Sequence, residues 1–198
     1  MIAAVVPAAG RSVRMGRPKL SLPFRGRTIL EHVVATLHAG GVERVLVVVG
    51  PHVPQLAPLA EKAGADVCRL ADETADMRAT VEHGLCWLEE HFHPRPDDAW
   101  LLAPADHPAL DVDVVRQLCV AYARQPGQTI LVPTYKGRRG HPTLVEWRHL
   151  AGIRAMSAGE GFNAYFRAHA GETLELPVAN SGVLCDLDTP EDYERLSG

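Results

Sequence analysis

Residues 1–20 read MIAAVVPAAGRSVRMGRPKL, an apolar run that breaks into a loop of small and basic residues. The run from Ala3 to Val6 is short, continuous and followed by proline, which is typical of a buried strand. The loop combines Ala8, Ala9 and Gly10 with three arginines and a lysine. Small residues let a ligand approach the backbone, and backbone N–H groups of such a loop can bind phosphate. The stretch therefore predicts a buried strand that ends in an anion-binding loop.

The following residues alternate between strand-like and helix-like segments. Apolar, β-branched runs predict strands at 44–50, 66–69, 99–106 and 129–133. Apolar residues at helical spacing predict helices at 28–39, 54–63, 77–91 and 111–124. Beyond residue 134 the pattern predicts a loop and strand at 137–146, a helix at 159–170, a strand at 173–178 and a helix at 189–198. Alternating strands and helices favour an α/β fold with a mostly parallel sheet between two helical layers.

Capping residues mark two of these helix boundaries. Gly40 and Gly41 follow the segment 28–39, as glycines do at helix C-termini. Thr189 is a favoured N-cap, and Pro190 would occupy the first helical position. Asp192 is expected to serve the same helix N-terminus.

Length and composition limit the classes of protein to consider. The chain has 198 residues, 46% hydrophobic and 22% charged, which predicts one domain over residues 1–198. The net charge of −4 argues against a broad basic face for nucleic acid. No apolar stretch approaches the length of a membrane span, and no basic segment precedes the first apolar run, so no membrane partner is expected.

The cysteines indicate a reducing compartment. Cys68, Cys86, Cys119 and Cys185 are far apart and form no C-x-x-C pair. Cys86 and Cys119 lie in apolar helical patterns, so buried thiols are expected at both positions. We therefore expect a cytoplasmic protein and, since the sequence has no heptad seam, a monomer.

Lys19 is distinctive in the first loop because lysine is rare in this chain. It recurs only at positions 62 and 136, whereas arginine is abundant. A compact ammonium suits a phosphate oxygen, so we expect Lys19 to bind phosphate. The loop is neither a G-x-x-x-x-G-K-[ST] P-loop nor a G-x-G-x-x-G motif, because five residues separate Gly10 from Gly16. A solvated basic turn is the alternative.

Carboxylates follow two other apolar runs. Asp106 comes after LLAPA, and a carboxylate at the end of a strand, facing a phosphate loop, suits Mg²⁺ shared with phosphate oxygens. The alternative is a turn or cap aspartate. Asp186 and Asp188 in VLCDLDTPED offer a second carboxylate, with helix N-terminus chemistry as the alternative. Alternation along a strand would put both on one side, so the sequence leaves the choice between them open.

Two further motifs are weaker. KGRRGHP at 136–142 is a basic, glycine-rich loop suited to an anionic acceptor, with a flexible surface loop as the alternative. His91 and His93 have H-x-H spacing, but no cysteine or carboxylate converges on them in the sequence pattern. We expect exposed histidines there rather than a metal pair.

Together these motifs resemble the molybdenum cofactor cytidylyltransferase family, and the resemblance spans nearly the whole chain. The segment VPAAGRSVRMGRPKLSLPFRGRTILEHVV, residues 6–34, resembles the family's opening signature. DMRATVEHGL, PADHP, RRGHPTLV and DLDTPED resemble its later motifs, although Thr80 stands where serine is usual. The resemblance implies a three-layer α/β/α, Rossmann-like (glycosyltransferase-A-like) fold with a mostly parallel mixed sheet.

The resemblance also implies roles for matching residues. Lys19, Arg14 and Asp106 would be catalytic, and Asp106 would bind Mg²⁺ or Mn²⁺ together with Asp188 or Asp186. The acceptor would lie near Arg139, Gly140, His141 and Pro142. The nucleotide would be bound by Ala8, Ala9, Gly10, Arg11, Ser12, Met15, Gly16, Arg78 and Thr80. The Ala8-Ala9 pair resembles the cytidine-using branch, so CTP is the expected nucleoside triphosphate.

The expected reaction is attack by an acceptor phosphate on the α-phosphate, with release of pyrophosphate. The resemblance implies molybdenum-loaded molybdopterin as the phosphorylated acceptor, and a molybdoenzyme or its chaperone as a partner. Transfer to a sugar phosphate or a polyol phosphate is one alternative. A non-catalytic chaperone that binds the molybdenum cofactor is the other.

Overall fold

The central sheet has eight strands in the computed structural model, which describes residues 1–124 and 127–197. The order across the sheet is β10-β7-β9-β6-β1-β4-β5, and β8 pairs with β7. A separate hairpin is formed by β2 (Pro23–Phe24) and β3 (Arg27–Thr28). The strands of the large sheet are β1 (Ile2–Ala8), β4 (Arg44–Val49), β5 (Asp66–Arg69), β6 (Ala99–Leu102), β7 (Ile130–Tyr135), β8 (Arg138–Arg139), β9 (Thr143–Glu146) and β10 (Thr173–Pro177).

Most strands of this sheet run in one direction. β1 is parallel to both of its neighbours, β4 and β6, and β5 is parallel to β4. β9 lies antiparallel between β6 and β7, so β7 again runs with β6, and β10 is parallel to β7. Among the described strands of this sheet, only β9 and the short β8 are antiparallel to their neighbours. The predicted mostly parallel mixed sheet is therefore confirmed.

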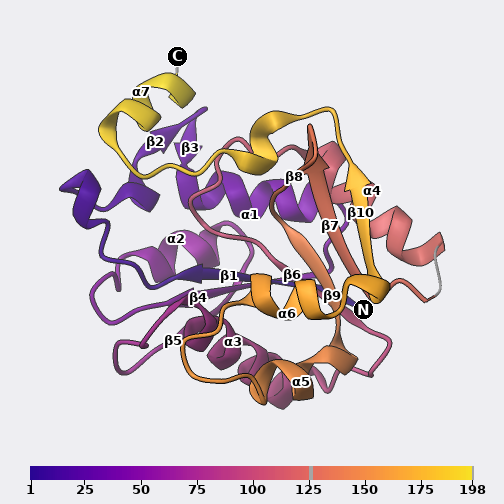
Figure 1. Ribbon diagram of the computed structural model, residues 1–198. Helices are drawn as coiled ribbons and strands as arrows, with labels where there is room; N and C mark the ends of the chain where they lie inside the picture. The colour runs from indigo at the N-terminus through magenta and orange to yellow at the C-terminus, as the bar shows by residue number, and fades with distance from the viewer. Residues whose placement is uncertain (125–126, 198) are drawn as a thin grey trace.

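Helices cover both faces of the sheet (Figure 1). One face packs against α1, α2 and α4, and the other packs against α3, α5 and α6. The last helix, α7, lies beside the β2–β3 hairpin, where Tyr193 Oη donates a hydrogen bond of 2.6 Å to the carbonyl of Pro23 (Figure 1). The helices are α1 (Ile29–Ala39), α2 (Leu56–Lys62), α3 (Met77–Phe92), α4 (Val112–Arg124), α5 (Leu150–Arg154), α6 (Phe162–Ala168) and α7 (Pro190–Ser197).

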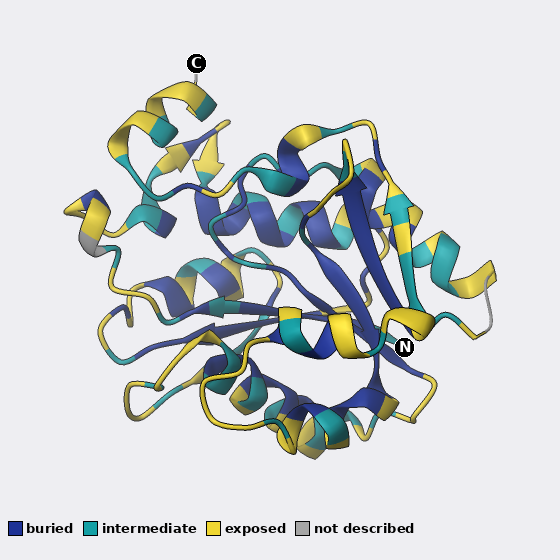
Figure 2. Ribbon diagram, in the orientation of Figure 1, coloured by how far each residue is buried: buried dark blue, intermediate teal, exposed yellow. Residues whose placement is uncertain are grey.

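The alternation of side chains along β1 divides the core into two layers. Ala4 and Val6 pack with α1, α2 and α4, whereas Ala3 and Val5 pack with α3, α5 and α6. All four are fully buried, and Figure 2 shows the sheet buried between helices whose outer sides are exposed. A strand buried on both faces has no polar positions to alternate with apolar ones. This is why the buried parts of β1 and β4, residues 3–6 and 45–49, are apolar without interruption in the sequence.

A glycine brings α3 close to the sheet. An added Cβ at Gly84 would lie 2.7 Å from Val48 Cγ2 and 2.9 Å from Val5 Cγ1, so a larger residue would push the helix outward. This close packing fixes where α3 begins, near the carboxyl end of β1. Asp76 caps that helix N-terminus by accepting a hydrogen bond of 2.8 Å from the backbone N–H of Ala79.

The structure confirms most predicted elements and corrects three points. The β2–β3 hairpin and α5 were not predicted from the sequence pattern. The interpretation of 186 and 188 as alternate strand positions is wrong, because a turn at Ser181–Leu184 leads into irregular backbone there. Cys119 is partly buried, but the prediction for Cys86 is wrong because its side chain is exposed. Within the described residues, no helix is both long and apolar enough to cross a membrane.

The predicted start of α7 is confirmed in detail. Thr189 Oγ1 accepts a hydrogen bond of 3.2 Å from the Asp192 N–H, and Asp192 Oδ2 accepts one of 3.0 Å from the Thr189 N–H. The reciprocal bonds satisfy two N–H groups that a helix N-terminus leaves free. Asp192 therefore serves this helix end, as predicted.

A similar reciprocal cap begins α1 and involves an unusually acidic carboxyl group. Thr28 Oγ1 accepts from the Glu31 N–H at 3.2 Å, and Glu31 Oε2 accepts from the Thr28 N–H at 2.8 Å. Lys62 Nζ donates to Glu31 Oε1 at 2.9 Å and so connects α2 to α1. The hydrogen bonds from Thr28, followed by that from Lys62, lower the pKa of Glu31 from 4.5 to about 2.

We expect Glu31→Gln to lower the free energy of unfolding by about 1–2 kcal/mol at pH 7. Because the folded-state pKa of Glu31 is depressed, its contribution is fully present above pH 4.5 and is lost as the pH falls toward about 2. The difference between wild type and variant should therefore shrink between pH 6 and pH 3 in urea unfolding. Glu90→Gln, at an exposed position of α3, is the control. A difference that stays constant over this range would contradict the assignment.

Candidate functional site

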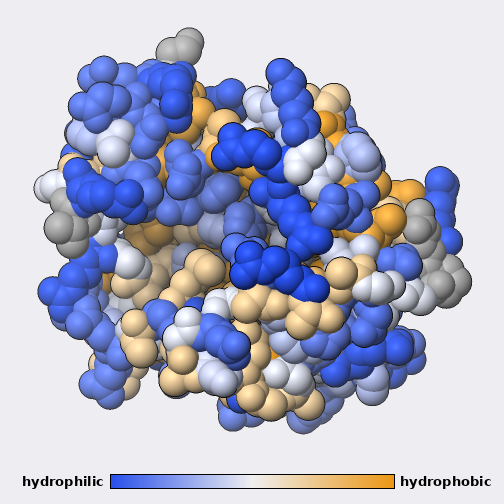
Figure 3. All heavy atoms as spheres, in the orientation of Figure 1, coloured by the Kyte–Doolittle hydropathy of each residue, from blue (hydrophilic) through white to orange (hydrophobic). Residues whose placement is uncertain are grey.

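A cavity of about 500 Å³ opens at the carboxyl ends of β1 and β6. Figure 3 shows the corresponding face of the molecule, which is hollowed left of centre, with hydrophilic residues above the hollow and more hydrophobic residues below it. Four segments contribute to the lining of the cavity: the end of β1 with the loop after it (residues 7–12, 14, 19 and 20), the start of α3 with the turn before it (residues 73, 74, 76, 77 and 80), residues 104–106 after β6, and Asp188 before α7. The cavity thus lies where ligands bind in open parallel sheets.

The loop after β1 is held by a close backbone approach and a tight turn. An added Cβ at Gly50 would lie 2.8 Å from Ala9 Cα, so β4 and this loop can approach only without a side chain there. Ser12 has a φ of 52°, its carbonyl accepts from the Met15 N–H at 3.1 Å, and its Oγ accepts from the Lys19 N–H at 3.3 Å. The turn therefore directs Lys19 back toward the cavity.

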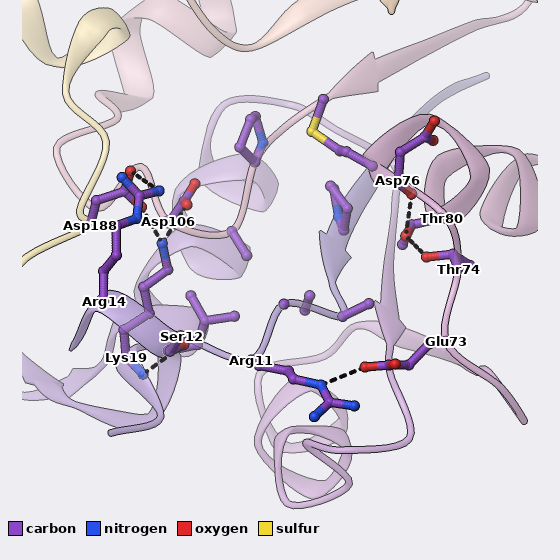
Figure 4. Close-up of a pocket in the computed structure, with 18 residues that line it drawn as sticks. Arg11, Ser12, Arg14, Lys19, Glu73, Thr74, Asp76, Thr80, Asp106 and Asp188 are labelled. Atoms are coloured by element: carbon purple, nitrogen blue, oxygen red, sulfur yellow. Dashed lines mark hydrogen bonds and ion pairs between the residues drawn. The ribbon is translucent and has the colours of Figure 1, made fainter. Parts of the chain in front are cut away.

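Lys19 is the centre of a charged cluster (Figure 4). Its Nζ donates to Asp106 Oδ2 at 2.6 Å, to Asp188 Oδ1 at 2.9 Å and to the carbonyl of Leu187 at 2.7 Å. The Lys19 side chain is 14% exposed, and those of Asp106 and Asp188 are 28% and 23% exposed. Arg14, which is largely exposed, also pairs with Asp188, from Nη2 to Oδ2 at 2.7 Å. One cation and two carboxylates are thus held together at low exposure.

This cluster shifts the pKa of two of its members. Burial alone would lower the pKa of Lys19, but the charge of Asp106 and the hydrogen bonds to both carboxylates outweigh burial and raise the pKa above its ordinary value. Burial would raise the pKa of Asp188, but the hydrogen bond and charge of Lys19, with those of Arg14, lower it. Both groups are therefore charged at neutral pH.

Close packing of loops brings Asp188 next to Asp106 across 82 positions of sequence. The carbonyl of Asp106 accepts a hydrogen bond of 2.8 Å from the Leu187 N–H. An added Cβ at Gly182 would lie 2.0 Å from the carbonyl oxygen of Ala109, so this segment requires glycine to lie on the loop after β6. The backbone therefore fixes the spacing of the two carboxylates.

The opposite wall of the cavity is polar but carries less charge (Figure 4). Thr74 and Thr80 lie with their hydroxyl oxygens 2.5 Å apart, and Thr80 Oγ1 donates to the carbonyl of Asp76 at 3.1 Å. Thr80 is buried, so its hydroxyl holds the turn before α3 in place. Met77 adds an apolar, partly exposed side chain at the same wall.

Arg11 and Glu73 meet between the two walls. Arg11 Nε donates to Glu73 Oε1 at 2.5 Å, and His52 Nε2 lies within 2.9 Å of the same oxygen. The hydrogen bond raises the pKa of Arg11 and lowers the pKa of Glu73. Both side chains are more than half exposed, so solvent screens this ion pair. It can open at low cost when an anion competes for Arg11.

Many residues expected at a site on sequence grounds do line this cavity. They are Ala8, Ala9, Gly10, Arg11, Ser12, Arg14, Lys19, Thr80, Asp106 and Asp188.

Three of the residues predicted to bind nucleotide do not line it. Met15 is buried beneath the loop, and Gly16, with a φ of 63°, is exposed at its outer turn. Arg78 points away, toward Glu82 at 3.4 Å and the carbonyl of Ser157 at 3.1 Å.

The predicted acceptor loop and the second aspartate also lie outside the lining. Arg139 pairs with Glu175 at 2.8 Å, and Gly140 packs against the Val183 carbonyl, which would lie 2.3 Å from an added Cβ. The ring of His141, next to Pro142, lies edge-on to that of His107, with centroids 5.3 Å apart. Asp186 is exposed and does not line the cavity, whereas Asp188 is partly buried beside Lys19.

Several lining residues were missed by sequence reasoning. They are Pro7, Leu20, Glu73, Thr74, Asp76, Met77, Pro104 and Ala105. Asp76 had a usable signal, since an aspartate directly before an apolar helical pattern is a typical N-cap. Glu73 and Thr74 had none, because their position depends on where the loop before α3 lies in space.

The donor atoms of the charged cluster suit a hard divalent cation. Two carboxylates and the Leu187 carbonyl converge on one cation, the ammonium of Lys19. Oxygen donors of this kind are those that Mg²⁺ and Mn²⁺ prefer. Among residues 1–124 and 127–197, no group of three or more His, Cys, Asp or Glu side chains is arranged to hold a metal. A divalent ion here would therefore take its other ligands from substrate phosphate and water.

Comparison with known proteins places the chain among nucleotide-binding enzymes. A family model described as the MobA-like NTP transferase domain matches residues 4–173. Nicotine blue oxidoreductase from Paenarthrobacter nicotinovorans is 27% identical and covers 98% of this chain and 96% of its own length. Molybdenum cofactor cytidylyltransferase from Escherichia coli is 25% identical, with coverage of 96% and 92%. 2-C-methyl-D-erythritol 4-phosphate cytidylyltransferase from Ralstonia nicotianae is 35% identical, but over 64% of this chain and 52% of its own.

Solved structures share the fold at low sequence identity. A nucleotidyl transferase from Methanothermobacter thermautotroptrophicus has a TM-score of 0.80 at 22% identity and covers 100% of this chain and 96% of its own. A protein from Mycobacterium tuberculosis, solved as a complex with manganese, has a TM-score of 0.70 at 24% identity, with coverage of 99% and 97%. The three-layer arrangement is therefore that of known nucleotidyltransferases.

We expect Gly50→Ala to lower the free energy of unfolding by about 1–3 kcal/mol, because its Cβ would press on the backbone of Ala9. Gly10→Ala is the matched control, since an added Cβ at Gly10 meets nothing within 4 Å and its φ is not positive. Chemical denaturation of both variants checks the difference. Equal effects of the two substitutions would show that the approach of Gly50 to Ala9 is not what holds the loop.

Proposed function

The chain belongs to the MobA-like NTP transferase family, and from this premise we propose that it is a nucleotidyltransferase, acting as a single domain over residues 1–198. It would transfer a nucleoside monophosphate, CMP from CTP, onto a phosphorylated acceptor and release pyrophosphate. The observation that carries the proposal is the convergence of Lys19, Asp106 and Asp188 at the carboxyl ends of β1 and β6. A lysine and two carboxylates facing a loop of small residues are the groups that phosphoryl chemistry requires.

The loop after β1 would bind the triphosphate. Ala8, Ala9 and Gly10 line the cavity with backbone and small side chains, so phosphate oxygens can reach the N–H groups. Arg11 would exchange Glu73 for a phosphate, since its present ion pair is exposed. Ser12 lines the same loop, while Met15 and Gly16 would support it from below and outside.

The opposite wall would receive the nucleoside. The hydroxyls of Thr74 and Thr80 would offer polar contacts there, beside the carboxylates of Glu73 and Asp76, and Met77 offers an apolar contact to a base. Arg78 would act by holding the start of α3 to the carbonyl of Ser157, with Glu82 one turn along the same helix, rather than by contacting the nucleotide. The distribution of charge supports this orientation, because the cationic groups Lys19 and Arg14 lie at the other end.

The reaction would proceed without a protein nucleophile. An acceptor phosphate oxygen would form a bond to the α-phosphorus while the bond to the β-phosphate oxygen breaks in line, and pyrophosphate leaves. Lys19 and Arg14 would stabilise the negative charge on the phosphates. Asp106 and Asp188 would hold Mg²⁺ or Mn²⁺, which neutralises phosphate charge and orients the reacting oxygens when bound.

The proposal also names the nucleotide and the acceptor. CTP is supported by the Ala8-Ala9 pair and by two cytidylyltransferases among the relatives. Molybdenum-loaded molybdopterin is supported as acceptor by the relative from Escherichia coli, whose likeness covers nearly the full length. The acceptor would approach past Asp106, where His107 meets the loop of Arg139, Gly140, His141 and Pro142. A cytoplasmic monomer and a molybdoenzyme or chaperone partner stay predictions.

Two alternatives remain as outcomes of the test. The cytidylyltransferase from Ralstonia nicotianae supports a polyol phosphate as the acceptor, and its likeness covers 64% of this chain. A chaperone that binds the finished cofactor would need no reactive cluster. The buried approach of Lys19 to two carboxylates favours catalysis, because a binding module has no need to hold two acids at a phosphate site.

We expect wild type to bind CTP more tightly than GTP, ATP or UTP in calorimetry with Mg²⁺, and to release pyrophosphate when molybdenum-loaded molybdopterin is supplied. Asp106→Asn and Asp188→Asn should each lower kcat by about 100-fold or more, because each removes a charge at the reacting phosphates. Asp186→Asn is the matched control and should stay near wild type, since Asp186 is exposed outside the cavity.

Each outcome separates the candidates. Pyrophosphate release only with a sugar phosphate or a polyol phosphate would keep the reaction and change the acceptor. Nucleotide binding without turnover on any acceptor would favour the chaperone. Near-wild-type turnover of Asp106→Asn would contradict the role given to this carboxylate.

A further inference from the structure

We propose that Lys19 and the divalent cation compete for one position between Asp106 and Asp188, so that the cation enters when nucleotide phosphate draws Lys19 away. The inference rests on the proposed function and concerns how its site is assembled. Its basis is the set of contacts that Lys19 makes in the free protein.

The ammonium of Lys19 has no donor left for a phosphate. An ammonium carries three N–H groups, and Lys19 Nζ has three acceptors: Asp106 Oδ2 at 2.6 Å, Leu187 O at 2.7 Å and Asp188 Oδ1 at 2.9 Å. Its side chain is mostly buried, so water cannot easily replace these partners. Binding a phosphate oxygen therefore requires Lys19 to give up at least one of them.

The same oxygens are the ones that a divalent cation would use. Hard oxygen donors converge at hydrogen-bond distance on Lys19 Nζ, and two of the three are carboxylate oxygens. Two cations at one such position would repel each other strongly at low exposure. Lys19 and the metal therefore exclude each other from the position between Asp106 and Asp188. Only one of the two can neutralise these carboxylates at a time.

Charge balance explains why nucleotide would drive the exchange. In the free protein Lys19 and Arg14 are matched by Asp106 and Asp188, so the cluster is already neutral. Metal alone would leave Lys19 and Arg14 without partners, and nucleotide alone would have to pull Lys19 from its acids. Together they supply a cation for the carboxylates and an anion for the amines. Each ligand should thus raise the affinity of the other, as linkage requires.

Titration of the free protein with Mn²⁺, followed by the electron paramagnetic resonance of unbound Mn²⁺, tests the exchange without any nucleotide. We expect Lys19→Met to bind Mn²⁺ at least about tenfold more tightly than wild type. Lys62→Met is the matched control, because Lys62 pairs with Glu31 away from the cavity, and it should leave Mn²⁺ affinity unchanged. Lys19→Met combined with Asp106→Asn should lose the added affinity.

The second part of the experiment measures how CTP changes the affinity for Mn²⁺. CTP should tighten Mn²⁺ binding by the wild type well beyond the Mn²⁺ that CTP binds in solution, and Lys19→Met should lose most of this effect. Lys19→Gln repeats both parts if the methionine variant does not fold, as judged by circular dichroism. Mn²⁺ affinity in Lys19→Met or Lys19→Gln that is equal to or weaker than in wild type would overturn the proposal. Absence of CTP binding and turnover in the wild type would instead overturn the proposed function, and the nucleotide-free comparison would still stand.

Discussion

The burial of β1 on both faces is the constraint around which this protein is arranged. Ala4 and Val6 lie against one helical layer and Ala3 and Val5 against the other, so the strand has no exposed side. Polar residues in this part of the chain can therefore lie only beyond the ends of the strand. The chain therefore leaves the sheet at Ala8 as a loop of small residues, beside the loops that follow β4 and β6. Packing in the core thus determines where an anion-binding site can form.

The charged cluster joins three segments that are distant in sequence. Lys19 comes from the first loop, Asp106 follows β6, and Asp188 precedes α7. None of the three acts alone: Lys19 keeps its charge in a partly buried place because two carboxylates are present, and Asp188 keeps its own because of Lys19 and Arg14. A site built from such mutual compensation is held ready for ligands of both signs. Under the proposed exchange, metal and nucleotide would bind such a site more tightly together than either would alone.

The fold was largely predictable from the sequence, because buried strands and capped helices have local signals. Thr189 and the glycines at 40 and 41 each acted as expected. The site was predictable only in part. Lys19 was identified by its rarity, and Asp106 by its place after a strand. The place of Asp188 rather than Asp186 beside Lys19 depends on how the irregular backbone at 185–188 packs on the loop of Asp106, and the presence of Glu73 and Thr74 depends on loop packing. No residue pattern encodes such contacts locally.

A crystal structure of the protein with CTP and Mn²⁺, using the anomalous signal of manganese, tests the central claim most directly. The account predicts manganese between Asp106 and Asp188, the triphosphate along the loop after β1, and Lys19 Nζ on a phosphate oxygen. Manganese bound elsewhere, with Lys19 still between the two carboxylates, would contradict it.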